Sequence, residues 1–149
     1  MESTEDLILD SCIIAGKILM ENGAEMHRVE DTMNRILDKE HGEGEAVSFV
    51  IPTGIFVTTR YGKNTKMKRI VTRKQNLEKI VEVNNLSRSF SAGSLSVSDL
   101  HDQLVYLENH DIDFPLWLKI VCSAVISGSM MLLFEGDPRD FVLTMAIGS

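Results

Sequence analysis

The chain has 149 residues, of which 44% are hydrophobic, and a formal net charge of −7. This length supports one domain with its own core, or a small domain with a further segment. Both cysteines, Cys12 and Cys122, lie in apolar stretches, which favours reduced packing residues and argues against a disulfide or a metal-binding pair. The acidic segment 1–10 lacks a basic region and a small-residue cleavage site, which argues against a signal peptide. We therefore expect residues 1–113 to remain in the cytoplasm.

Two helices are predicted at the start of the chain. Apolar residues recur at helical spacing over residues 5–21, and Gly23, which follows them, is a natural left-handed cap. A second, amphipathic helix is expected over residues 25–40, with Val29 and Met33 in its apolar stripe.

β-branched and aromatic residues then replace the helical pattern. The segment 46–62 predicts two short strands around a turn or bulge at Pro52-Thr53-Gly54, and residues 66–73 predict a third strand. Helical spacing returns in two further segments, 76–93 and 96–109. We expect an α+β domain of about four helices and a small antiparallel sheet.

An apolar run follows this domain. Residues 115–134 contain one charge, Lys119, and a helix of this length covers roughly 30 Å of hydrocarbon at about 1.5 Å per residue. Small residues recur in the run, as they do where transmembrane helices pack closely, and Trp117 suits the interface. We predict that this helix spans a membrane; the alternative is a buried helix of a soluble protein. The predicted division is a cytoplasmic domain, a transmembrane helix, a loop and the start of a second transmembrane helix, at residues 1–113, 114–134, 135–140 and 141–149.

Charge is distributed unevenly along the chain. Residues 1–45 carry 12 acids and 4 bases, whereas residues 60–74 carry seven bases and no acids. A basic run of this kind binds nucleic acid, faces anionic lipid, or forms an exposed hairpin that complements the acidic helices. Only Tyr61 interleaves an aromatic ring with the bases, so we expect a lipid bilayer and no nucleic acid among the partners.

The charged face of the second helix is a candidate for chemistry. His27 and Asp31 have i, i+4 spacing and could share a proton or a metal ion, but no third ligand accompanies them. With Asn34 and Asp38 they lie opposite the apolar stripe, and we favour an exposed helix face. Thr53 sits in a turn that can present a hydroxyl, although an ordinary turn residue is favoured. No nucleotide-binding loop or nucleophile motif is found, so we expect no enzyme, no catalytic residue, no metal and no cofactor.

Three segments in order, followed by an apolar helix, resemble the N-terminal half of the threonine/serine exporter family. They are "AGKILMENGAEMHRVEDTMNRI" (15–36), "FVIPTGIFVT" (49–58) and "NLEKIVEVNNLSR" (76–88). The matching positions are Gly16, Gly23, Ala24, Glu25, Arg28, Glu30, Thr32, Pro52, Thr53, Gly54, Ile55, Asn76, Leu77, Val83, Asn84, Leu86, Ser87 and Arg88.

The resemblance implies export of small polar metabolites across the bacterial cytoplasmic membrane, driven by the proton gradient. The implied substrates are threonine and serine, or a dicarboxylate such as succinate. Family members continue with more membrane helices, and a second apolar run here stops at Ser149. The expected partners are therefore the remaining helices of the same protein or a second membrane subunit, and a homo-oligomer stays open. The alternatives are a membrane-tethered regulatory or scaffolding subunit and a hydrolase-like domain.

The resemblance also selects residues for the family motif or a substrate path. These are Glu25, Arg28, Glu30, Pro52, Thr53, Gly54, Asn84, Ser87 and Arg88. For Arg28 we favour a structural pair with Glu25 that locks the helix to the sheet; the alternative is that Arg28 or Arg88 binds a substrate carboxylate. The run 115–134 contains no carboxylate to relay protons, which places any coupling group in further helices or at the link from Glu135 to Asp140.

Overall fold

The computed structural model describes residues 4–59, 64–110 and 115–133. By the contacts between its residues, the chain divides into two units, Met1–Ile112 and Asp113–Ser149. Within the described residues, the first unit holds four helices and three strands and the second unit holds one helix. Their bounds are α1 Thr4–Glu21, α2 Met26–His41, β1 Ala46–Ile51, β2 Gly54–Thr59, β3 Thr65–Arg69, α3 Leu77–Ser91, α4 Val97–Asn109 and α5 Leu116–Leu133.

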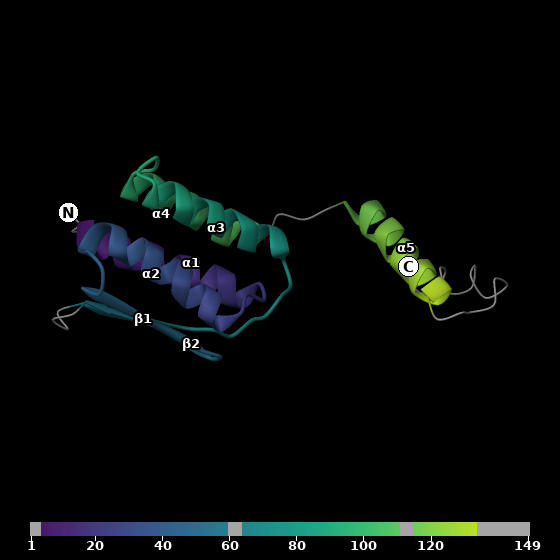
Figure 1. Cartoon of the computed structure of the whole chain (residues 1–149), viewed down its shortest axis with the longest axis horizontal. Coiled ribbons are helices and arrows are strands. Elements are labelled where there is room, and N and C mark those ends of the chain that lie inside the picture. The colour runs from purple at the N-terminus through teal and green to yellow at the C-terminus, as the bar shows by residue number, and fades with distance from the viewer. Residues whose placement is uncertain (1–3, 60–63, 111–114, 134–149) are drawn as a thin grey trace. The chain divides into compact units, whose positions relative to one another are not determined.

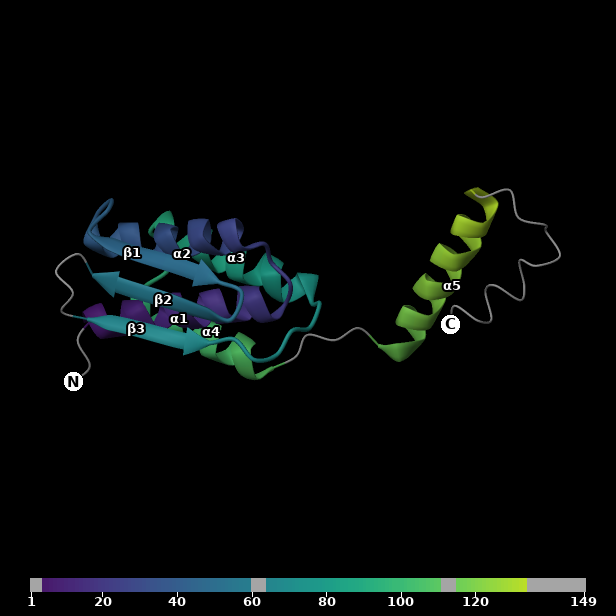
Figure 2. The ribbon, with the colours of Figure 1, turned by 90° about the horizontal axis from the view of Figure 1, so that it is seen from below.

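The first unit has three layers. Helices α1 and α2 form the middle layer, with α3 and α4 packed on one side and the sheet on the other (Figure 1). The sheet is antiparallel in the order β1-β2-β3, and Figure 2 shows its strands in front of α1 and α2. Neighbouring strands are in register, so that Phe49 lies opposite Phe56, and Phe56 lies opposite Met67.

The layered arrangement follows from the distribution of apolar residues. Helix α1 is apolar on most of its surface because it is covered on both sides, and α2 is amphipathic because one face meets solvent. The core lies between the layers and includes Leu9, Leu19, Met33, Ile55 and Leu104, all fully buried. Each large apolar side chain buried in this way contributes about 1.5–3 kcal/mol to stability.

Two glycines shape α1 and the turn that follows it. Gly16 allows close packing of the helix, and Gly23 allows a sharp turn after its end. A Cβ atom at Gly16 would lie 2.5 Å from Sδ of Met33 and 3.1 Å from Cδ1 of Ile55, so the side-chain-free position lets α1 approach α2 and β2. Gly23 has φ +94°, a left-handed conformation that glycine adopts without strain. The predicted cap at Gly23 is therefore confirmed, and the amide of Ala24 donates to the carbonyl of Leu19 at 3.0 Å.

The α+β class and the order of elements in the first unit are confirmed, with helix ends within two residues or so of those predicted. The third strand is shorter than predicted, because after Ile70 the chain leaves the sheet and follows the end of α1. There the amide of Lys74 donates to the carbonyl of Glu21 at 2.6 Å, and that of Asn76 to the carbonyl of Asn22 at 3.3 Å. These bonds satisfy the free carbonyls at the C-terminal end of α1.

Both cysteines are free, but their surroundings differ. Cys12 is fully buried in the core, as predicted, and burial raises the pKa of its thiol far above the usual range. Cys122 is exposed on α5, so the prediction that it is a packing residue is wrong for the helix as described.

Helix α5, in the second unit, is apolar around its circumference. Its exposed apolar side chains include Leu116, Trp117, Ile120, Val121, Val125, Ile126 and Met130. The hydroxyl of Ser129 donates to the carbonyl of Val125 at 2.8 Å, so this polar group is satisfied within the helix. The predicted helix is therefore present.

The structure does not confirm that α5 spans a membrane. Within the described part of the chain, no helix combines the length and the apolar character that a membrane crossing requires. The predicted loop at 135–140 and the predicted second helix at 141–149 lie outside the described residues.

Candidate functional site

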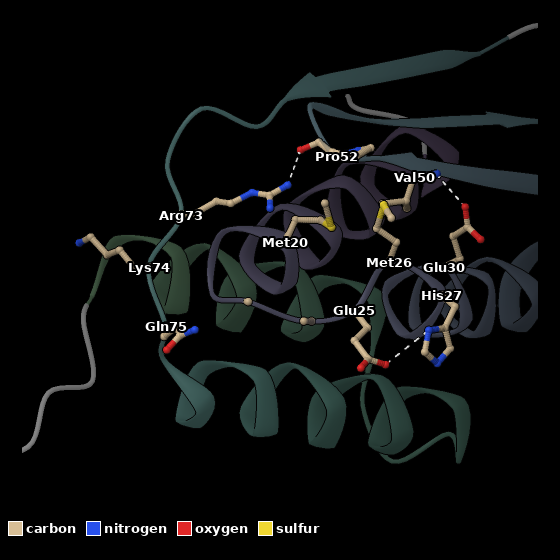
Figure 3. A pocket seen from close by; sticks show the side chains of 12 residues that line it. Met20, Glu25, Met26, His27, Glu30, Val50, Pro52, Arg73, Lys74 and Gln75 are labelled. Carbon is tan, nitrogen blue, oxygen red and sulfur yellow. Dashed lines mark hydrogen bonds and ion pairs between the residues drawn. The ribbon is translucent and has the colours of Figure 1, made fainter.

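An open groove of about 940 Å³ lies in the first unit, where the turn from α1 to α2, the end of β1 and the segment 73–75 meet (Figure 3). Gly23 makes the turn between the helices, and the hydrogen bonds of Lys74 and Asn76 to the end of α1 hold the segment 73–75 beside it. The groove is thus built by parts of the chain that are about 50 residues apart.

Arg73 supplies a cation on one side of the groove. Its Nη2 donates to the carbonyl oxygen of Pro52 at 2.9 Å, which ties the guanidinium to the turn between β1 and β2. A guanidinium has five N–H donors, so this bond leaves donors for a ligand. Lys74 also lines the groove, but its side chain is turned away from Arg73 in Figure 3.

Carboxylates supply the opposite charge on the other side. Oε1 of Glu30 accepts a hydrogen bond from the amide of Val50 at 2.9 Å, which joins α2 to the edge strand β1. The side chain of Glu25, the residue before α2, is exposed, and its Oε2 lies 3.6 Å from Nδ1 of His27. The second carboxylate oxygen of each glutamate can accept a further bond.

Apolar side chains separate the two charged sides. Figure 3 shows Met20 and Met26 between Arg73 and Glu30, and Met20 is buried whereas Met26 is exposed. Thioether side chains adapt their shape to small ligands. The groove thus has a cation on one side, carboxylates on the other and methionines between them, which are groups that can bind a small charged or zwitterionic molecule.

A row of polar contacts, called here the polar seam, joins α2 to α3 on the side of α2 that faces away from the sheet. The hydroxyl of Thr32 donates to Oδ1 of Asn84 at 3.2 Å, and Nη1 of Arg35 donates to Oγ of Ser87 at 3.5 Å. Ser87 is buried, and its own hydroxyl donates to the carbonyl of Asn84 at 2.9 Å. Asn84 and Ser87 therefore have positions in the scaffold, away from the groove.

The structure separates the nine selected residues into different places. Glu25, Glu30 and Pro52 line the groove, whereas Asn84 and Ser87 lie in the seam between α2 and α3. Of the remaining four, Thr53 lies in the turn between β1 and β2, Gly54 begins β2, and Arg28 and Arg88 lie on exposed helix faces. The carbonyl of Thr53 accepts from the amide of Ile70 at 3.0 Å, which is an ordinary turn contact.

The link between α2 and the sheet differs from the favoured interpretation of Arg28. That side chain is exposed and forms no ion pair with a described residue, while Glu25 lies beside His27. Glu30 makes the link, together with Asn34, whose Oδ1 accepts from the amide and the hydroxyl of Ser48 at 3.3 and 2.7 Å. Helical spacing had placed Asn34 on the exposed face.

The sequence did not single out Arg73, Met20 and Met26 as site residues. Arg73 belongs to the basic run 60–74, and its position in that run gave no signal that the chain returns to the end of α1. His27 and Asp31 are both exposed, and among the described residues no group of three His, Cys, Asp or Glu side chains could hold a metal ion.

Comparison with known protein families gives a match over most of the chain. Residues 10–149 match the model of the family ThrE, described as "Putative threonine/serine exporter", so the match includes both units of the chain. No curated protein and no solved structure was found to match. Because the family model covers nearly the whole sequence, the chain belongs to the threonine/serine exporter family.

Proposed function

We propose that this chain is the N-terminal part of a membrane exporter of threonine and serine, with its first unit on the cytoplasmic side. The observation that carries the proposal is the family match, which extends from α1 through α5. Further membrane helices, from the same protein or a second subunit, complete the transport path, because one helix encloses no path through a bilayer.

In this proposal, the helix predicted at 114–134 crosses the membrane. The exposed apolar side chains around α5 support this, because a helix that is apolar on every side requires an apolar environment. Trp117 and Lys119 stand at one end of the helix, where an interfacial aromatic ring and a snorkelling cation belong. We place the first unit in the cytoplasm because its basic run follows the positive-inside tendency.

The groove of the first unit binds the amino acid before export. Arg73 pairs with the α-carboxylate, and the negative charge of Glu25 and Glu30, beyond the methionines, attracts the cationic α-ammonium end of the amino acid to the groove. A dicarboxylate such as succinate fits this arrangement less well, because its second carboxylate would face two glutamates. The amino acids are therefore the favoured substrates.

We propose the proton gradient as the driving force, as in the interpretation from sequence. Among its described residues α5 carries no carboxylate, so a proton-coupling group on this helix has no support. The coupling group then belongs to a different part of the exporter.

Efflux of labelled threonine from cells that carry the full-length exporter tests the proposal. Arg73→Gln removes the cation of the groove and is expected to lower the rate of efflux at limiting internal threonine, with a smaller effect at saturation. Lys39→Gln is the matched control, because it removes an exposed cation near the C-terminal end of α2, away from the groove.

Each outcome separates the hypotheses. Unchanged efflux for Arg73→Gln would contradict the role of the groove while leaving the exporter intact. Normal efflux in cells that lack this chain would instead favour a regulatory or scaffolding subunit. A hydrolytic activity of the purified protein that depends on Thr53 would favour the hydrolase-like alternative.

A further inference from the structure

The outer face of the sheet carries an ordered row of large apolar side chains. One face of the sheet packs on α1 and α2, and the other is open in Figure 2. Because the strands are in register, Phe49 of β1, Phe56 of β2 and Met67 of β3 lie side by side across the open face. Their exposed fractions are 59%, 37% and 70%.

Further apolar residues extend the row. Val47 lies two residues before Phe49, on the same face of β1, and is exposed, as is Val71 just beyond β3. The solvated face of an antiparallel sheet normally carries polar residues in alternation with buried apolar ones. An apolar row across all three strands therefore marks an interaction surface.

Basic residues lie along one edge of this row. From residue 46 to residue 77 the sequence contains seven bases and no acid. Arg69 is exposed and lies two residues from Met67, on the same face of β3. Lys68 lies opposite the buried Ile55, on the other face, but it is exposed on this edge strand, and its long side chain can extend past the edge of the sheet. The acids of the first unit lie on other elements, mainly on the helices. The open face is therefore apolar at its centre and cationic at its edge.

We propose that the outer face of the sheet docks on the anionic headgroup surface of the membrane. Phe49, Phe56 and Met67 enter the interface, and Arg69 and Lys68 pair with lipid phosphates. The proposal rests on the membrane insertion of α5 proposed above, which holds the first unit close to a bilayer. Docking would then orient the first unit against that surface.

Charge and shape distinguish the lipid surface from other occupants. A second copy stacked on this face would bring two cationic edges together, which costs free energy. A nucleic acid could pair with the same cations and stack on Phe49 and Phe56, but the aliphatic side chains of Val47, Met67 and Val71 give it no partner, and the proposed insertion of α5 keeps this unit beside lipid. An anionic lipid surface offers an apolar interface to the row and phosphates to the basic side chains at its edge.

The test places an environment-sensitive fluorophore on the row of the full-length protein in lipid nanodiscs. The label is attached through Met67→Cys in a Cys122→Ala background, where Cys12 remains buried and unreactive. A matched control label is attached through Gln103→Cys, an exposed position of α4 in the layer opposite the sheet. Emission is compared between neutral phosphatidylcholine discs and discs that also contain phosphatidylglycerol.

Docking predicts a blue shift at position 67, and none at position 103, when anionic lipid is present. Because each base near an anionic surface contributes roughly fivefold to binding, Lys68→Gln with Arg69→Gln is expected to lower the ratio of docked to undocked protein by about 25-fold. Salt at about 1 M, where the Debye length is about 3 Å, should reverse the shift as well.

Several results would overturn the inference. Equal emission in both kinds of disc, or a shift that survives the double substitution, would contradict docking on anionic lipid. A shift in neutral discs that requires a second copy or an added oligonucleotide would assign the face to that occupant. If the chain fails to remain in the discs, the proposed membrane insertion fails first; if it remains and no shift occurs, only the docking is wrong.

Discussion

Gly16 offers a sharp test of how α1 packs in the first unit. A Cβ atom at this position would stand 2.5 Å from Sδ of Met33, inside the contact distance of two heavy atoms, and Met33 is fully buried. Gly16→Ala therefore forces the Met33 side chain to move within a packed core. Overpacking of this kind costs about 1–3 kcal/mol, whereas alanine in place of a helical glycine regains about 0.5–1 kcal/mol.

The net expectation for Gly16→Ala is a loss of about 1 kcal/mol in the free energy of unfolding of the first unit. The natural assay is the rate at which a thiol reagent modifies Cys12 in the Cys122→Ala background. Cys12 is fully buried in the core, so its modification requires opening of the first unit. A loss of about 1 kcal/mol corresponds to a roughly fivefold faster modification when opening and closing are fast.

A second variant identifies the origin of the effect. Met33→Ala removes the side chain that collides with the new Cβ atom, at its own cost of about 2–5 kcal/mol. In that background the 2.5 Å contact is lost, and Cδ1 of Ile55, 3.1 Å from the new Cβ atom, can shift into the space that Met33 leaves, so Gly16→Ala is expected to slow the modification of Cys12 instead of accelerating it. If Gly16→Ala has the same sign in both backgrounds, the contact with Met33 is not the constraint at this position.

Three further predictions use the same thiol-modification assay. Gly23→Ala should destabilise the first unit by about 1–2 kcal/mol, because φ +94° places the new side chain in the left-handed region; no loss would mean that the turn relaxes to another conformation. The hydrogen bond from Lys17 to Glu108 at 2.6 Å raises the pKa of Lys17, so the stability that this pair provides is present below pH about 10.4 and is lost as the pH rises through the raised pKa. The difference between the wild type and Glu108→Gln should therefore persist through neutral and mildly alkaline pH and shrink above that pH, and a difference that disappears near neutral pH would contradict this. Asp10→Asn weakens the 2.7 Å ion pair with Lys66 that joins α1 to β3; it should cost up to about 1 kcal/mol, decreasing at high salt, and an effect independent of salt would point to packing.

Sequence patterns predicted the helices and strands of the first unit well because caps, turns and apolar stripes depend on residues that are close together in the sequence. The cap at Gly23, the turn at Pro52 and Thr53 and the helical stripe of Val29 and Met33 each depend on neighbours within a few residues. The sequence pattern of the apolar run likewise predicted a helix, and α5 is present.

The groove could not be predicted in the same way because its two charged sides come from distant segments. Arg73 reaches it only because the chain leaves the sheet after Ile70 and bonds to the end of α1. Helical spacing predicted that Asn34 is exposed to solvent. In the structure the edge strand β1 packs beside it, and the amide and hydroxyl of Ser48 donate hydrogen bonds to its Oδ1. Periodicity assigns a residue to a face, and the tertiary fold decides what that face meets.

Several of the residues that carry the resemblance to the family join the layers of the first unit. Gly16 lets α1 approach α2, Glu30 ties α2 to β1, and Thr32 bonds to Asn84 of α3. Such contacts specify a scaffold and leave the ligand undetermined, which is why the motif points to a family more clearly than to a substrate. Arg73 lies outside the matched motif positions, so the charge that would select an amino acid carboxylate is supplied by the segment between the sheet and α3. Changes in that segment are therefore expected to alter substrate choice without disturbing the fold.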